Sequence, residues 1–89
     1  MTPKQHEMFG YAVAAVRDEY AEAKGKFKDF NSDHEGFAVI LEELDELWEA
    51  IKKNKSNGRK RDEAVQVAAM AIRFLTDVIY TPEYGGEDG

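Results

Sequence analysis

The segment from residue 63 to residue 79 constrains the fold most, because it has the pattern of a helix that is apolar on nearly every side. The polar residues Glu63, Gln66, Arg73 and Asp77, with Met70 between them, follow one another at steps of three and four. They therefore form one line along the helix. A helix of this kind is typical of the centre of a bundle or of a subunit interface. We expect it to run from about residue 59 to about residue 80, where a Thr-Pro pair would end it.

Two further helices are predicted ahead of this segment. Thr2 as N-cap, Pro3 in the first turn and Gln5 closing a capping box predict a helix over residues 3–28. Ser32 and Glu35 form a second capping-box pattern and predict a helix over residues 33–54, followed by a turn at residues 56–58. No segment has the alternation typical of a strand. The apolar stripes at helical spacing are Phe9, Val13, Val16, Tyr20, Ala23, Phe27 and Phe30 in the first helix, and Phe37, Ile40, Leu41, Leu44, Leu47, Trp48 and Ile51 in the second.

These patterns predict an all-α bundle of three main antiparallel helices in one small domain, residues 1–82, with a mobile acidic tail at residues 83–89. The helices offer more apolar surface than 89 residues can cover, so we expect a homodimer or homotetramer to complete the bundle. The longest apolar run is far too short for a membrane span, so no membrane association is expected. The lack of cysteine excludes disulfides and thiolate chemistry, and favours a cytoplasmic location.

Acidic residues interrupt the two central helices at matching heights. Glu43 lies in a largely apolar flank of the second helix, and Glu46 lies beside it, three residues on. In an antiparallel hairpin, Glu46 and Glu63 fall within about one helical turn of each other, and Glu43 and Gln66 follow one turn further from the loop. A carboxylate in an apolar face needs a partner. Three carboxylates and an amide would suit Mg²⁺, with Mn²⁺ as an alternative.

The sequence resembles the all-α nucleotide pyrophosphohydrolases that include the MazG-like proteins. Their motif is Glu-x-x-Glu, often with an extra leading Glu, followed on the next helix by Glu-x-x-Asp. Here Glu42, Glu43 and Glu46 match the first half, and Glu63 matches the start of the second half. Gln66 stands where the motif has Asp. The resemblance covers residues 32–78, about half of the chain.

The resemblance implies an enzyme that uses Mg²⁺ to hydrolyse a nucleoside triphosphate, often a deoxynucleotide or a noncanonical one, to a monophosphate and pyrophosphate. It implies that Glu43, Glu46, Glu63 and Gln66 hold the metal. Glu42 would be a further ligand or, with Glu43, part of the catalytic machinery that orients water. An amide oxygen coordinates a hard cation but adds no charge, so Gln66 predicts weaker metal binding, fewer ions or impaired catalysis.

Other residues are candidates for substrate binding. The segment 52–61 holds six basic residues and no acid, and Lys53 and Arg59 in it could contact nucleotide phosphates. The alternative is that this segment only complements a helix dipole and forms a soluble turn. Arg73 could reach phosphate or form an ion pair between helices, and Trp48 could stack on a nucleobase or lie in the core. Nucleic acid is not an expected partner, because the remainder of the chain is strongly acidic.

Two alternatives to the enzyme remain open at this point. The first is a catalytically silent protein of the same fold that binds nucleotide or metal, with Gln66 as its signature. The second is a purely structural helical bundle, in which the acids from Glu42 to Glu49 form a solvated face.

Overall fold

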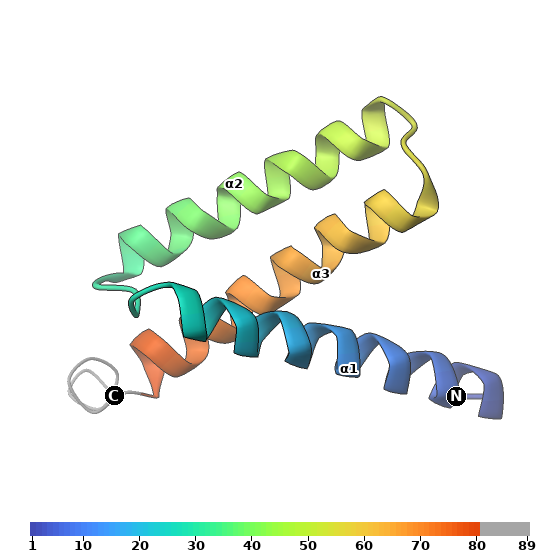
Figure 1. Ribbon diagram of the computed structural model, residues 1–89, viewed down its shortest axis with the longest axis horizontal. Helices are drawn as coiled ribbons and strands as arrows, with labels where there is room; N and C mark the ends of the chain where they lie inside the picture. Colours follow the sequence, from blue (N-terminus) through green and yellow to red (C-terminus); the bar gives the residue numbers. More distant parts are fainter. Residues whose placement is uncertain (81–89) are drawn as a thin grey trace.

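The computed structural model describes residues 1–80, which form three α-helices and one turn of π-helix. The helices are α1 (Pro3–Lys26), α2 (Asp33–Lys52) and α3 (Asn57–Phe74), and α3 continues into the π-helix η1 (Leu75–Ile79). α2 and α3 form an antiparallel hairpin, and α1 crosses α3 on its other side (Figure 1). α3 packs against both α1 and α2, which scarcely meet each other. The sequence-based prediction of three helices with the third in the centre is therefore confirmed.

The starts of the helices follow the capping residues. Thr2 and Gln5 form the predicted capping box at the start of α1. At α2, the Ser32 hydroxyl accepts from the Glu35 amide, but the Glu35 carboxylate accepts from the amide of Asn31, one residue earlier than a capping box requires. The predicted turn at 56–58 is wrong, because Ser56 caps α3 and the helix begins at Asn57.

The helices end earlier than predicted. α1 ends at Lys26 rather than at residue 28, and α2 ends at Lys52 rather than at residue 54. Asn54, with φ of 50°, provides the left-handed residue that turns the chain after α2. The predicted tail at residues 83–89 lies outside the described residues.

The π-helix η1 is a departure from the single long third helix that the sequence predicted. The Tyr80 amide donates to the Leu75 carbonyl five residues back, at 2.8 Å. This wider turn shifts the phase of the helix beyond α3. Asp77 and Val78, both in this turn, are buried.

A small core lies where α1, α3 and η1 meet the loop that follows α1. Its buried residues are mostly small or flexible, and Gly36 brings α2 close to it. A Cβ at Gly36 would lie 2.6 Å from the Phe74 ring and 3.2 Å from the Phe30 ring, so only glycine fits there. The buried hydrophobic residues of this cluster are Ala23, Phe30, Ala69, Met70 and Val78.

Much of the apolar surface stays exposed. Trp48 is 55% exposed, so of the two alternatives considered for it, a position in the core is wrong. The apolar stripe of α1 is buried at Ala23, but the Phe9 and Phe27 side chains are 61% and 60% exposed. The homo-oligomer expected from the sequence stays a prediction. Within residues 1–80, no helix combines the length and hydropathy that crossing a membrane requires.

Candidate functional site

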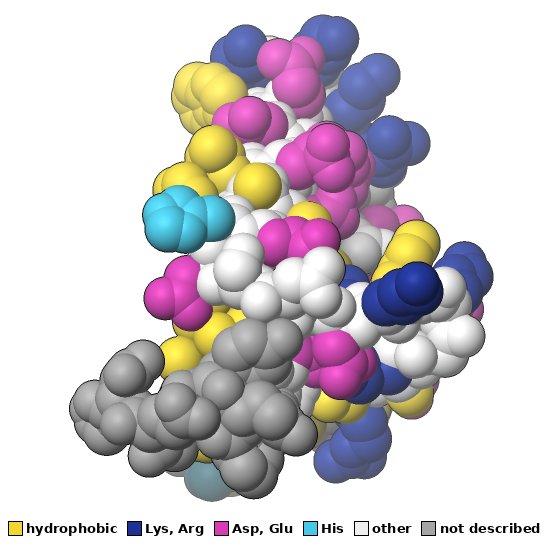
Figure 2. Space-filling view, turned by 90° about the vertical axis from the view of Figure 1, so that its left-hand side faces the viewer, with side chains coloured by type: hydrophobic (Ala, Val, Ile, Leu, Met, Phe, Trp, Pro, Cys, Tyr) yellow, Lys and Arg dark blue, Asp and Glu magenta, His cyan; other side chains and the backbone are white. Residues whose placement is uncertain are grey.

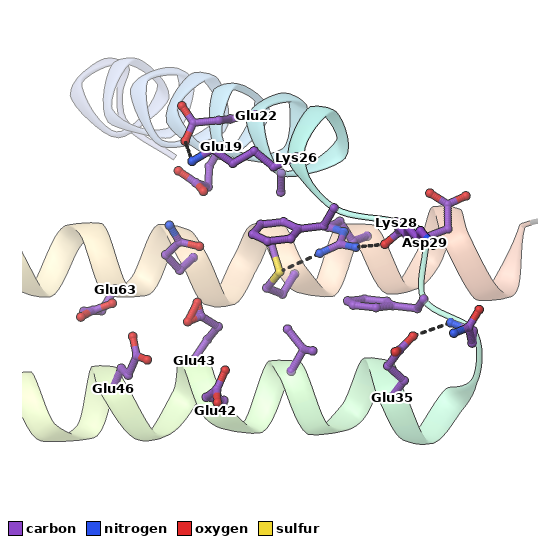
Figure 3. A pocket seen from close by; sticks show the side chains of 18 residues that line it. Glu19, Glu22, Lys26, Lys28, Asp29, Glu35, Glu42, Glu43, Glu46 and Glu63 are labelled. Atoms are coloured by element: carbon purple, nitrogen blue, oxygen red, sulfur yellow. Dashed lines mark hydrogen bonds and ion pairs between the residues drawn. The ribbon is translucent and has the colours of Figure 1, made fainter.

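Acidic side chains from α2 and α3 line one open cavity of about 680 Å³. Glu43 and Glu46 of α2 and Glu63 of α3 point into the space between the two helices (Figure 3). Gln66 and Glu42 line the same cavity. The structure thus brings the three carboxylates and the amide to the wall of one cavity.

The pKa of Glu43 is raised by its place in this cavity. Burial raises the pKa of Glu43, and the nearby carboxylates of Glu46, Glu63, Glu42 and Glu19 raise it further. A carboxyl group in this position holds its proton more tightly than usual, because ionisation adds charge to an acidic wall that is partly shielded from water. A bound cation would therefore stabilise the ionised carboxylates of this site.

Glu63 is the most buried of the acids in the cavity. It is 9% exposed, and it forms an ion pair with Arg59 one turn earlier, at 3.3 Å between Nε and Oε2. Because the Arg59 side chain is 63% exposed, this pair leaves Glu63 facing both the cavity and a solvated cation. Gln66, one turn further along α3, is half-buried in the cavity wall.

α1 adds two acids that the sequence analysis did not single out. Glu19 and Glu22 line the cavity opposite the hairpin, and Glu22 pairs with Lys26 at 3.6 Å (Figure 3). The signal was present in the spacing, since Glu19 lies three residues after Val16 and four before Ala23, beside the apolar stripe of α1. Figure 2 shows acidic side chains gathered down the middle of one face of the molecule.

The other end of the cavity is formed by the loop after α1 and by Arg73. The Arg73 guanidinium lies 4.2 Å from the Phe30 ring centroid and 5.9 Å from that of Phe27. Its Nη2 donates to the Lys28 carbonyl at 2.8 Å, and its Nη1 donates to the Met70 sulfur at 3.6 Å. Arg73 therefore fastens the loop to α3.

A buried ionic network supports this end. Asp77 pairs with Lys24 of α1 and accepts from the Phe30 amide at 3.2 Å, while Arg73 Nε lies 3.7 Å from its Oδ2. Burial alone would raise the pKa of Asp77, but the hydrogen bonds from Lys24 and the Phe30 amide, with the charges of Lys24 and Arg73, lower it. Arg73 therefore does not form the ion pair between helices that was considered for it, because its partner Asp77 lies one turn further along the same continuous helix. The ion pair between helices joins Asp77 to Lys24 of α1.

Three predicted substrate-binding residues lie away from the cavity wall. Lys53, Arg59 and Trp48 are absent from the residues that line it, whereas Arg73 is among them. Lys53 instead pairs with Glu49 at 3.1 Å, and Trp48 lies 5.9 Å from the Lys52 ammonium. The cations that do line the cavity are Lys26, Lys28 and Arg73.

The donors around the cavity are carboxylate and amide oxygens, the ligands that Mg²⁺ and Mn²⁺ prefer. In the part of the chain that the structure describes, no three acidic or histidine side chains lie close enough together to hold a metal ion as they stand. The three glutamates would have to adopt other rotamers to share one ion.

Comparisons with known proteins found no match for this chain among family models, curated proteins or solved structures.

Proposed function

We propose that this protein is a Mg²⁺-dependent nucleotide pyrophosphohydrolase that cleaves a nucleoside triphosphate, such as a deoxynucleotide, to a monophosphate and pyrophosphate. One observation carries the proposal. Glu43 and Glu46 of α2 and Glu63 and Gln66 of α3 line the same cavity, which is of a size suited to a small molecule. Glu-x-x-Glu on α2 and Glu-x-x-Gln on α3, which resemble the two-helix motif of the MazG-like proteins except at Gln66, thus line one cavity.

The metal would be held by the carboxylates of Glu43, Glu46 and Glu63 and by the amide oxygen of Gln66. The donor chemistry fits a hard cation, and the raised pKa of Glu43 indicates negative charge that a cation would neutralise. When bound, Mg²⁺ would supply neutralisation of the polyphosphate charge.

The chain's own residues would do three things. Glu42, exposed at the cavity wall, would orient a water molecule and accept its proton as oxygen bonds to the phosphorus of the α-phosphate. The bond from that phosphorus to the bridging oxygen breaks, and pyrophosphate leaves. Lys26 and Lys28 would contact phosphate oxygens, with Arg73 behind them. Nucleotide as substrate, Mg²⁺ or Mn²⁺ as cofactor and the cytoplasmic location all stay predictions.

The test is to incubate the purified protein with each common NTP and dNTP, with Mg²⁺, Mn²⁺ or EDTA, and to resolve the products by chromatography. We expect monophosphate and pyrophosphate, and their loss with EDTA and in Glu63→Gln. Asp62→Asn is the matched control, since the neighbouring Asp62 is exposed, pairs with Arg61 and is outside the cavity wall. Equal loss of activity in both variants, or no turnover beside an active control enzyme, would contradict the proposal.

Gln66 favours a second candidate, a protein of this architecture that binds nucleotide or metal without turnover. A neutral ligand lowers the charge available to hold a cation. Calorimetric titration with Mg²⁺ and with nucleotide separates the candidates when turnover is absent, because binding would indicate the silent protein and no binding would leave a structural bundle.

A further inference from the structure

A row of large apolar side chains on α2 is left exposed by the rest of the described chain, residues 1–80. Phe37, Leu41, Leu44, Trp48 and Ile51 are between 42% and 62% exposed. They follow one another at steps of four, three, four and three, which is the spacing of a helix-pairing seam. We refer to these five residues as the α2 seam.

The α2 seam lies on the opposite side of α2 from the cavity. At about 100° per residue, Glu46 and Val39, which line the cavity, are roughly 180° around the helix from the centre of the seam. In Figure 2 hydrophobic side chains follow the upper left edge of the molecule, apart from the acids in the middle. A partner on the seam would therefore leave the cavity open.

The order of residues along the seam is nearly symmetrical about Leu44. Phe37 lies seven residues before Leu44 and Ile51 seven residues after it. Leu41 lies three residues before it and Trp48 four after it. When a second copy of α2 lies antiparallel with its Leu44 against the first, every seam residue meets a seam residue: Phe37 meets Ile51, and Leu41 meets Trp48.

The charges at the ends of α2 favour the same orientation. Its first turn carries Asp33 and Glu35, and its last turn and the following residues carry Lys52, Lys53 and Lys55. Antiparallel pairing brings the acidic end of each helix to the basic end of the other, and it also opposes the two helix dipoles. Parallel pairing would place like charges together.

We propose that two copies of this chain associate through the α2 seam, antiparallel, with Leu44 on the two-fold axis. The covering partner is a second copy, because an antiparallel copy of α2 complements the seam in two ways. Its apolar residues fall opposite those of the seam, and its charged ends fall opposite ends of the other sign. The inference does not depend on the enzymatic proposal, since the seam and the cavity lie on opposite sides of α2.

Cysteine cross-linking tests both the partner and its orientation in a chain that has no native cysteine. Leu44→Cys should oxidise to a disulfide dimer, because the two Cα atoms would lie within bridging distance across the axis. Phe37→Cys alone should not, since the two sites would be about 21 Å apart along the helix, but it should cross-link to Ile51→Cys in an equimolar mixture. Ala38→Cys, exposed but off the seam, is the control that should form no disulfide between chains. Self-linking of Phe37→Cys, or no linking of Leu44→Cys beyond the level of the control, would overturn the proposal.

Sedimentation equilibrium gives a second readout without new thiols. The natural chain should dimerise, and Leu44→Glu should be monomeric at concentrations where the natural chain is dimeric. Because Leu44 is 47% exposed in the single chain, the variant should keep its helical circular dichroism. A natural chain that is monomeric up to about 1 mM, or a Leu44→Glu variant that stays dimeric, would overturn the proposal.

Discussion

Lys24 of α1 and Asp77 of η1 form a salt bridge between residues 53 positions apart in the sequence. Asp77 is buried, and it also accepts from the Phe30 amide in the loop between α1 and α2. One carboxylate thus joins three parts of the chain. This carboxylate and Arg73 both bind the loop after α1, through the Phe30 amide and the Lys28 carbonyl, and so fix one end of the acidic cavity.

Asp77→Asn should lower the free energy of unfolding by about 3 kcal/mol or more, because Lys24 and Arg73 would lose their buried counter-charge. Asp29→Asn is the control. Asp29 also pairs with Lys24, but its side chain is 64% exposed, so its loss should cost less than about 1 kcal/mol. Urea unfolding followed by circular dichroism measures both, and similar losses in the two variants would contradict the role assigned to Asp77.

Gly36→Ala should destabilise the fold by about 1 to 3 kcal/mol, because the new Cβ would overlap the Phe74 ring. Gly10→Ala should have the opposite effect. A Cβ at Gly10 would meet nothing within 4 Å, so the substitution should stabilise α1 by about 0.5 to 1 kcal/mol through helix propensity alone. Thermal melts of the two variants provide the comparison, and the same sign for both would be inconsistent with close packing at Gly36.

Glu43→Gln should stabilise the metal-free protein at neutral pH. The folded-state pKa of Glu43 is raised above its ordinary value of 4.5, so the folded chain binds this proton more tightly than the unfolded chain. Stability from that group is full below about pH 4.5 and is lost as the pH rises through the raised pKa. The advantage of the variant over the natural chain should therefore grow as the pH rises from about 4.5 to 7.

Denaturant unfolding at several pH values measures this advantage. Asp45→Asn, which removes an exposed acid of α2 outside the cavity wall, is the control. A difference between Glu43→Gln and the natural chain that does not vary with pH would contradict the shared charge at the cavity.

Gln66→Asp should strengthen Mg²⁺ binding by about tenfold, because a fourth charged oxygen ligand would join Glu43, Glu46 and Glu63. The same change should destabilise the metal-free protein, since it adds another acid to the cavity. Calorimetric titration with Mg²⁺ measures the affinity, and Gln5→Asp, at the exposed start of α1, is the control. Equal Mg²⁺ affinity in both variants would argue against Gln66 as a ligand.

Local patterns were enough to predict several features. The capping box of Thr2 and Gln5, the three helices and the central position of α3 followed from capping chemistry and apolar periodicity. The convergence of Glu43, Glu46 and Glu63 also followed, because the rise of a helix and the position of the α2–α3 turn determine which residues share a height. Whether these acids bind metal and nucleotide stays a prediction.

Other features depended on contacts between distant segments. The π-turn η1, the burial of Asp77 and its salt bridge with Lys24 arise where α1, the following loop and α3 meet, and no local pattern encodes that meeting. The same holds for Glu19 and Glu22, which reach the cavity only because α1 crosses α3 at a particular angle.

Trp48 shows most clearly which features follow from the sequence and which follow from tertiary packing. The sequence by itself determined that Trp48 belongs to an apolar stripe, since helical periodicity is a property of nearby residues. Only the tertiary structure decided which face of α2 meets α3, and it turned the side bearing Glu43, Glu46 and Gly36 inward. The close approach of Phe74 to Gly36 requires a face without a bulky side chain, so the face with the largest apolar residues was left outward.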